Sequence, residues 1–206
     1  MTTETTPIAP TEPLGDRFEH AWRFAEFLAE AQSNAILWRD QYRLARVPDE
    51  LVARASRLSG HWRLLVLVED WCGDAVNTVP VLARLAELAP ALELRVLARD
   101  RNLDVMDAHL TDGKRSIPKV LVLDGAGVVR ASWGPRPSEL QHWFLAEGVT
   151  LEKDLRYRHV RTWYARDRGR ATLEEVLALV EGAARASDGA LSGGGSVELP
   201  LTTSAD

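Results

Sequence analysis

The single cysteine of this chain, Cys72, lies in the segment Trp71-Cys72-Gly73-Asp74-Ala75, between an apolar run and an amphipathic stretch. This position is the predicted end of a strand and the predicted start of a helix. A helix N-terminus stabilises a thiolate, so we expect a lowered Cys72 pKa, in the range of about 3.5–7.5 found for activated thiols. Position 75, where a dithiol site would carry its second cysteine, is Ala75.

The residues around Cys72 act on it in different directions. Gly73 keeps the turn open and lets backbone N–H groups face the sulfur. Asp74 works against ionisation, because a nearby carboxylate disfavours a second negative charge. The Trp71 ring is expected to shield one side of the sulfur. The alternative interpretation is structural, since unpaired cysteines often pack as small hydrophobic residues.

Strand and helix patterns alternate through the middle of the chain. The run at 64–68 is continuously apolar, which is typical of a strand covered on both faces. In chain order the predicted elements are a strand at 64–68, a helix at 76–88, a strand at 92–97, a helix at 103–110, strands at 120–123 and 128–132, and a helix at 138–146. Glycines in the turn at 124–127 favour a hairpin between the last two strands. The order is therefore β-α-β-α-β-β-α, an α/β fold.

Helical patterns also flank this core on both sides. We predict a flexible head at 1–15, an N-terminal helical block at 16–60, the core at 61–147, C-terminal helices at 148–186 and a flexible tail at 187–206. The head and the tail lack a periodic apolar face, so burial would not offset the entropy lost on ordering them.

Composition excludes several classes of function. The net charge of −5 argues against a nucleic-acid partner. A lone cysteine forms no internal disulfide and no thiolate zinc site, and the histidines have no ligand-spaced companions, so we predict no metal and no cofactor. The head lacks the features of a signal peptide, and no run reaches membrane-spanning length. We therefore expect a cytoplasmic protein without a membrane partner.

The element order and four positions together resemble thioredoxins. Trp-Cys-Gly stands at the first strand-to-helix junction, Pro80 lies inside the following helix, Ile117-Pro118 precedes the third strand, and Gly134 follows the hairpin. The resemblance covers about residues 63–146 and implies a mixed four-stranded sheet with helical extensions. It also implies that Pro118 is a cis-proline facing Cys72 and that Gly134 lies beside the substrate groove. The Trp-Cys-Gly-Asp motif is similar to that of a group of bacterial thioredoxin-like proteins.

Two departures from the family pattern limit the predicted activity. Ala75 replaces the resolving thiol, and Val66 stands where thioredoxins hold a buried acid. Dithiol turnover is therefore disfavoured. We predict a monothiol thiol-disulfide oxidoreductase in which Cys72 is the nucleophile. Its partners would be a protein disulfide substrate and a low-molecular-weight thiol that resolves the mixed disulfide.

Two other functions remain open. A redox-inactive binding module would keep the groove formed by Ile117, Pro118 and Gly134 without using the thiol. Peroxide reduction or sensing at Cys72 ranks third, because Glu69 stands where the peroxiredoxin motif places a threonine.

Three further features have weaker functional interpretations. His109 is expected at the surface of a short helix rather than in a metal site. Arg136, in Gly134-Pro135-Arg136-Pro137, lies either in a rigid loop that opens the next helix or in contact with an anion. A set of aromatic side chains is expected to form a core between the added helices: Trp143, Tyr157, Trp163 and Tyr164.

Overall fold

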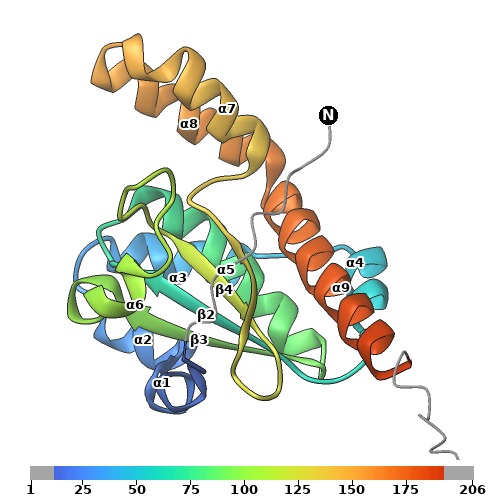
Figure 1. Cartoon of the computed structure of the whole chain (residues 1–206). Coiled ribbons are helices and arrows are strands. Elements are labelled where there is room, and N and C mark those ends of the chain that lie inside the picture. The colour runs from blue at the N-terminus through green and yellow to red at the C-terminus, as the bar shows by residue number, and fades with distance from the viewer. Residues whose placement is uncertain (1–11, 193–206) are drawn as a thin grey trace, which may run out of the picture.

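A five-stranded mixed sheet forms the centre of the computed structural model, which describes residues 12–192 (Figure 1). The strands are β1 (Trp22–Arg23), β2 (Trp62–Val68), β3 (Leu92–Ala98), β4 (Lys119–Leu123) and β5 (Val129–Trp133). Their order is β1-β3-β2-β4-β5. β2 and β3 are parallel, whereas β2–β4, β4–β5 and β1–β3 are antiparallel.

The predicted four-stranded core is confirmed, with β1 as an addition at the sheet edge. β2 lies between β3 and β4, so residue 65 pairs with Arg95 on one side and Leu121 on the other. Leu64 to Val68 are all fully buried, which is why this strand carries an unbroken apolar run. The two-residue β1 has too little sequence to show a strand pattern of its own.

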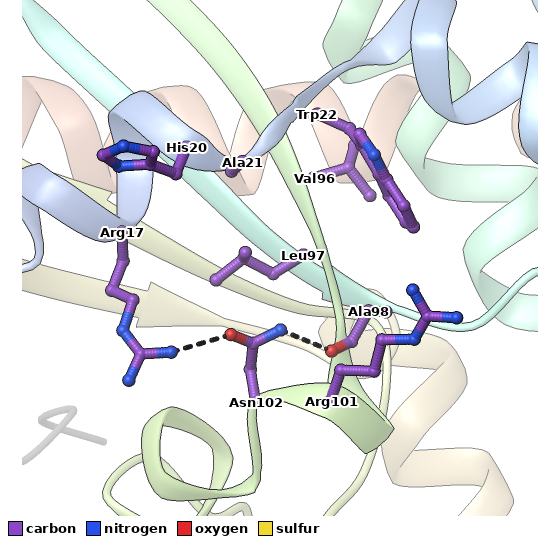
Figure 2. Close-up of a pocket in the computed structure, with 9 residues that line it drawn as sticks. All are labelled: Arg17, His20, Ala21, Trp22, Val96, Leu97, Ala98, Arg101 and Asn102. Atoms are coloured by element: carbon purple, nitrogen blue, oxygen red, sulfur yellow. Dashed lines mark hydrogen bonds between the residues drawn. The ribbon is translucent and has the colours of Figure 1, made fainter.

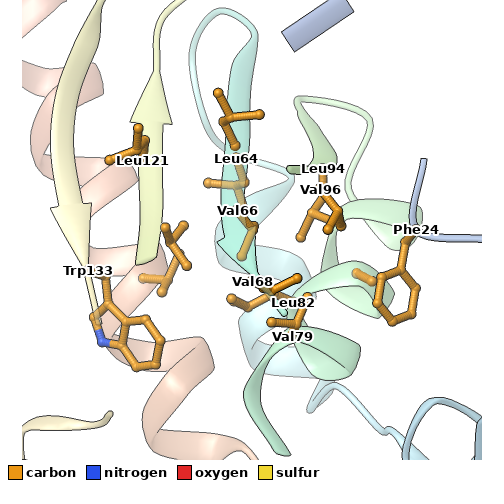
Figure 3. Packing of buried hydrophobic residues seen from close by; sticks show 14 of the residues in the cluster. Phe24, Leu64, Val66, Val68, Val79, Leu82, Leu94, Val96, Leu121 and Trp133 are labelled. Carbon is orange, nitrogen blue, oxygen red and sulfur yellow. The ribbon is translucent and has the colours of Figure 1, made fainter. Parts of the chain in front are cut away.

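Helix α5 (Gly73–Leu88) packs its apolar face on the sheet. Val66 and Val68 of β2 and Val79 and Leu82 of α5 belong to one buried cluster (Figure 3). Pro80 lies inside α5 and is itself buried. The turn η1 (Arg99–Arg101) and the short helix α6 (Leu103–Asp107) follow β3.

Four short helices form the predicted N-terminal block: α1 (Gly15–His20), α2 (Phe24–Glu30), α3 (Ala35–Leu44) and α4 (Asp49–Ala55). Aromatic side chains join two of them, because Phe27 of α2 meets Trp38 of α3 edge to face at a centroid distance of 4.9 Å. Trp38 is fully buried. The block is therefore part of the main core rather than a separate unit.

The C-terminal helices divide into two groups. α7 (Ser138–Ala146) and α8 (Lys153–Asp167), joined through η2 (Gly148–Thr150), extend away from the sheet as an arm (Figure 1). The arm, residues 138–167, has a small buried cluster of its own, made of Leu140, Val160 and Tyr164. α9 (Arg170–Ser192) instead packs on β5, α5 and α4.

The structure also bears on the predicted ends of the chain. α9 continues to Ser192, so the predicted tail boundary at 187 is wrong. The remainder of the predicted tail, 193–206, and positions 1–11 of the predicted head lie outside the described residues. Within residues 12–192, no helix combines the length and apolarity needed to cross a bilayer.

Candidate active site

Cys72 is the N-cap residue of α5, directly after the loop that leaves β2. Its side chain is buried, with 6% exposure, and its S–H donates to the carbonyl oxygen of Ile117 at 3.4 Å. The Ile117–Pro118 peptide bond is cis. The fold therefore brings the Cys72 motif next to the Ile117-Pro118 segment, as the resemblance implies. The Ile117 carbonyl here accepts a hydrogen bond from the thiol.

Gly134 packs directly against the backbone of Pro118. Its φ is +120°, and a Cβ at this position would lie 2.1 Å from the carbonyl oxygen of Pro118. Only glycine fits such an approach of two backbones. The end of β5 is therefore held close to the cis-proline segment.

The pKa of Cys72 is raised, not lowered as its place at a helix start suggested. Burial has the largest effect, because a thiolate loses its hydration inside the protein. The N–H groups of Ala75 and Asp74 lower the pKa, whereas the Asp74 carboxylate raises it. The helix-start effect is present, but burial outweighs it.

Asp74 is a buried acid beside Cys72, and both of its oxygens have partners. Arg136 Nη2 lies 2.6 Å from Oδ2, and the Tyr164 hydroxyl donates to Oδ1 at 3.0 Å. The Asp74 and Arg136 side chains are only 12% and 14% exposed. Burial raises the pKa of Asp74, and Arg136 acts in the opposite direction. We call Asp74, Arg136 and Tyr164 the Asp74 cluster.

Arg136 links this cluster to the arm. Its guanidinium carbon lies 3.9 Å from the centroid of the Phe144 ring, and Nη1 donates to the side-chain oxygen of Gln141 at 3.0 Å. Its Nε is buried and has no acceptor among the described residues. Arg136 does contact an anion, and that anion is Asp74. Its loop also opens α7, with Pro137 as the N-cap residue, as the structural interpretation of this segment predicts.

Sequence reasoning missed Tyr164 as a site residue. It placed Tyr164 only in the aromatic core of the added helices, where it does lie, buried beside the half-buried Trp143 and Trp163. Tyr157 was wrongly included in that core, because its side chain is 42% exposed. Burial and the neighbouring Asp74 strongly raise the pKa of the Tyr164 hydroxyl, which therefore stays a hydrogen-bond donor.

The loop before Cys72 is fastened by the N-terminal helical block. The Asp70 carboxylate accepts the backbone N–H groups of Gln32 and Ser33, each at 2.8 Å. The Asp70 carbonyl accepts the indole N–H of Trp38 at 2.8 Å. Trp71 is 52% exposed, and the Arg99 guanidinium lies 5.3 Å from its ring centroid. The block thus positions the motif, which sequence reasoning did not foresee.

A second pair of titratable groups lies at the start of β4 and in the segment between α6 and β4. Lys119 is buried, and its Nζ donates to the Thr111 hydroxyl at 3.1 Å. His109 was expected at the surface, and this is wrong: it is 6% exposed, and its Nε2 has no partner among the described residues. Burial and then the Lys119 charge lower its pKa. We call these two residues the His109 pair.

The hollow shown in Figure 2 is separate from the cysteine. Its volume is about 350 Å³, and it lies where α1 and β1 meet the end of β3. Asn102 spans it, accepting from Arg17 and donating to the carbonyl of Ala98. Cys72 is not among its lining residues. Across residues 12–192, no three side chains of the metal-binding types are grouped as a metal site.

Comparisons with known proteins agree with the fold. A family model described as Thioredoxin matches residues 21–155. A protein of unknown function from Pseudomonas aeruginosa has a similar crystal structure, with a TM-score of 0.69 and 24% identity over 84% of this chain and 100% of that one. An HIV epitope scaffold has a TM-score of 0.63 and 23% identity over 82% and 98% of the two chains. No curated protein matches this chain.

Proposed function

The chain belongs to the thioredoxin family, and from this premise we propose that it is a monothiol thiol-disulfide oxidoreductase with Cys72 as its nucleophile. One observation carries the proposal: the Cys72 sulfur lies at the start of α5, beside the carbonyl that precedes a cis-proline. N–H groups of Asp74 and Ala75 act on the same sulfur and stabilise its thiolate. This arrangement suits attack on a disulfide held next to Pro118.

The reaction would proceed in two exchanges. After Cys72 loses its proton to solvent, its thiolate attacks a disulfide RS–SR′. A Cys72–SR bond forms, the RS–SR′ bond breaks, and R′S⁻ leaves with the electron pair. An external thiolate R″S⁻ then attacks the SR sulfur, which forms RS–SR″ and returns Cys72 as a thiolate. R′ is reduced and R″ is oxidised, so the electrons balance.

The external thiol is needed because the chain has no second cysteine. Ala75, where that thiol would be, is fully buried and inert. Val66, at the place of the family's buried acid, is fully buried as well. A mixed disulfide on Cys72 would therefore persist until a low-molecular-weight thiol arrives. The raised pKa of Cys72 implies that the resting protein holds a thiol and that exchange accelerates as pH rises.

The test is adduct formation on the intact protein. Treatment with glutathione disulfide should add one glutathionyl group, and reduced glutathione should remove it, as read by intact mass spectrometry. Cys72→Ser is the matched control and should form no adduct. Ala75→Cys should convert the persistent adduct into an internal disulfide. A wild-type protein that forms no adduct even at pH 9 would contradict the proposal.

A redox-inactive binding module is the second candidate. The 6% exposure of Cys72 and the donation of its S–H to Ile117 favour this function, because both restrict access to the sulfur. In that case Cys72→Ser should behave like the wild type in every cellular assay in which deletion has a phenotype. A Cys72→Ser phenotype equal to that of the deletion would reject the binding module.

A further inference from the structure

We propose that Asp74 restrains the ionisation of the Cys72 thiol by pairing with Arg136, and that Arg136 is a counter-charge for the thiolate whose effect this pairing weakens. In this proposal Asp74, Arg136 and Tyr164 are positioning residues that set the reactivity of the thiol. The biological purpose of this control rests on the proposed function. The control itself concerns only thiol ionisation, so it can be tested without a substrate.

The first support is the placement of charge around the sulfur. Asp74 lies in the first turn of the helix that Cys72 caps. Two charged groups act on Cys72: Asp74 from α5 and Arg136 from the loop before α7. Tyr164 of α8, which contacts Asp74, is in turn influenced by Cys72. From the cis-proline segment, the neutral carbonyl of Ile117 accepts a hydrogen bond from the thiol. Arg136 is thus the single cation among these groups.

The second support is how completely Asp74 engages that cation. The Arg136–Asp74 contact of 2.6 Å is a short, charge-assisted hydrogen bond, and both side chains are at least 86% buried. A guanidinium held so closely by a carboxylate has its field largely cancelled at a third group nearby. Asp74 therefore opposes the thiolate in two ways, by its own charge and by neutralising Arg136.

The third support is that the arm holds this arrangement in place. Tyr164, from the small cluster inside the arm, donates to the second oxygen of Asp74. Phe144 of α7 lies against the guanidinium of Arg136. Phe144 lies on α7, the last helix of the predicted core, and Tyr164 lies on α8, which follows that core. The arm thereby adds to the Trp-Cys-Gly-Asp motif a control that its fourth residue, Asp74, could not exert alone.

Removal of the Asp74 charge should therefore activate the thiol. Asp74→Asn keeps the side chain's shape, removes the opposing charge and leaves Arg136 free to stabilise the thiolate. Both changes favour the thiolate, and the effect of one nearby charge corresponds to a change of about tenfold or more in the thiolate fraction. Because a more acidic thiol is also less nucleophilic, we expect alkylation at pH 7 to become about threefold or more faster.

The experiment is the pH profile of iodoacetamide alkylation on the full chain. Asp74→Asn should move the midpoint to lower pH, Arg136→Gln should move it to higher pH, and the double variant should lose most of the gain from Asp74→Asn. Glu181→Gln, which removes a partly buried partner of Arg54 far from Cys72, is the matched control and should leave the profile unchanged. If Arg136→Gln does not fold, the double variant, which lacks both charges, replaces it. The difference between Asp74→Asn and the double variant then measures the effect of the Arg136 charge on the thiol.

Two outcomes would overturn the inference. One is an Asp74→Asn profile that matches the wild type or moves to higher pH. The other is an equal shift with and without Arg136, since the cation would then have no part. These results are independent of whether the wild type forms the glutathione adduct that tests the proposed function. A shifted profile with no glutathione adduct in the wild type would reject the oxidoreductase and keep the charge control, and the reverse result would do the opposite.

Discussion

The structure contains two pairs of buried titratable groups, and the two pairs differ in the charges that they combine. In one pair, Asp74 and Arg136 have opposite charges, and each has a further hydrogen-bond partner. In the other pair, His109 and Lys119 are both bases, and burial lowers the pKa of each. The acid whose charge acts on Lys119, Asp112, stabilises it only from a distance.

This difference predicts which pair depends on charge at neutral pH. A buried ion pair is destabilised strongly when one partner is removed, because the other charge stays buried without compensation. Two buried bases tolerate the loss of a charge but not the gain of one. The Asp74 cluster should therefore be sensitive to mutation, and the His109 pair should be sensitive to acid.

The largest expected effect is on the stability of Arg136→Gln. This change leaves the Asp74 carboxylate buried without its cation and should lower the free energy of unfolding by about 3–5 kcal/mol, measured by urea denaturation. Arg54→Gln is the matched control, because its pair with Glu181 is about one-quarter to one-third exposed and should cost about 1 kcal/mol or less. Equal losses for the two variants would remove the distinction between a buried and a partly exposed pair.

The hydroxyl of Tyr164 should have the next largest effect. Tyr164→Phe removes one hydrogen bond to a buried carboxylate and should cost about 1.5–3 kcal/mol in the same urea measurement. Tyr157→Phe, on the exposed part of the same helix, should leave stability unchanged. A loss of the same size at both tyrosines would show that the arm, rather than Asp74, responds to these substitutions.

The core of the fold could be predicted because its signals are local. The apolar run at 64–68 and the glycine-containing turn at 124–127 each specify their own element without information from elsewhere. The Asp74 cluster has no such signal, since Tyr164 lies 90 positions along the chain from the acid it contacts. A pattern on α8 shows that Tyr164 faces inward, but not which group its hydroxyl meets.

The two wrong predictions about titratable residues share one physical reason. The helix start suggested a low pKa for Cys72, and the short helix suggested an exposed His109. Both predictions used the local element alone. Burial depends on what the rest of the chain packs around that element, and in both cases desolvation has the largest effect on the pKa.

Acid should destabilise the protein through His109. Because its folded-state pKa lies below the ordinary value of about 6.5, the folded protein binds fewer protons than the unfolded chain. Its contribution to stability is therefore present above pH 6.5 and is lost as pH falls through the folded-state pKa. Between pH 7.5 and 5.5 we expect the wild-type Tm to fall by about 2–4 °C more than that of His109→Gln. Parallel pH profiles for the two proteins would show that His109 is not the group responsible.

The smallest effect, and the sharpest contrast with Arg136, is expected for Lys119→Met. A buried lysine replaced by an apolar side chain of similar length loses a hydrogen bond to Thr111 but no ion pair, so stability at pH 7.5 should change by about 1 kcal/mol or less. The Lys119 charge also lowers the pKa of His109, so its removal should bring that pKa nearer to the ordinary value. The acid-induced loss of stability should then become shallower, and NMR titration of the His109 ring should show the higher pKa directly. An acid loss and a His109 pKa that are unchanged in Lys119→Met would mean that the two bases do not act on each other, and that burial alone controls His109.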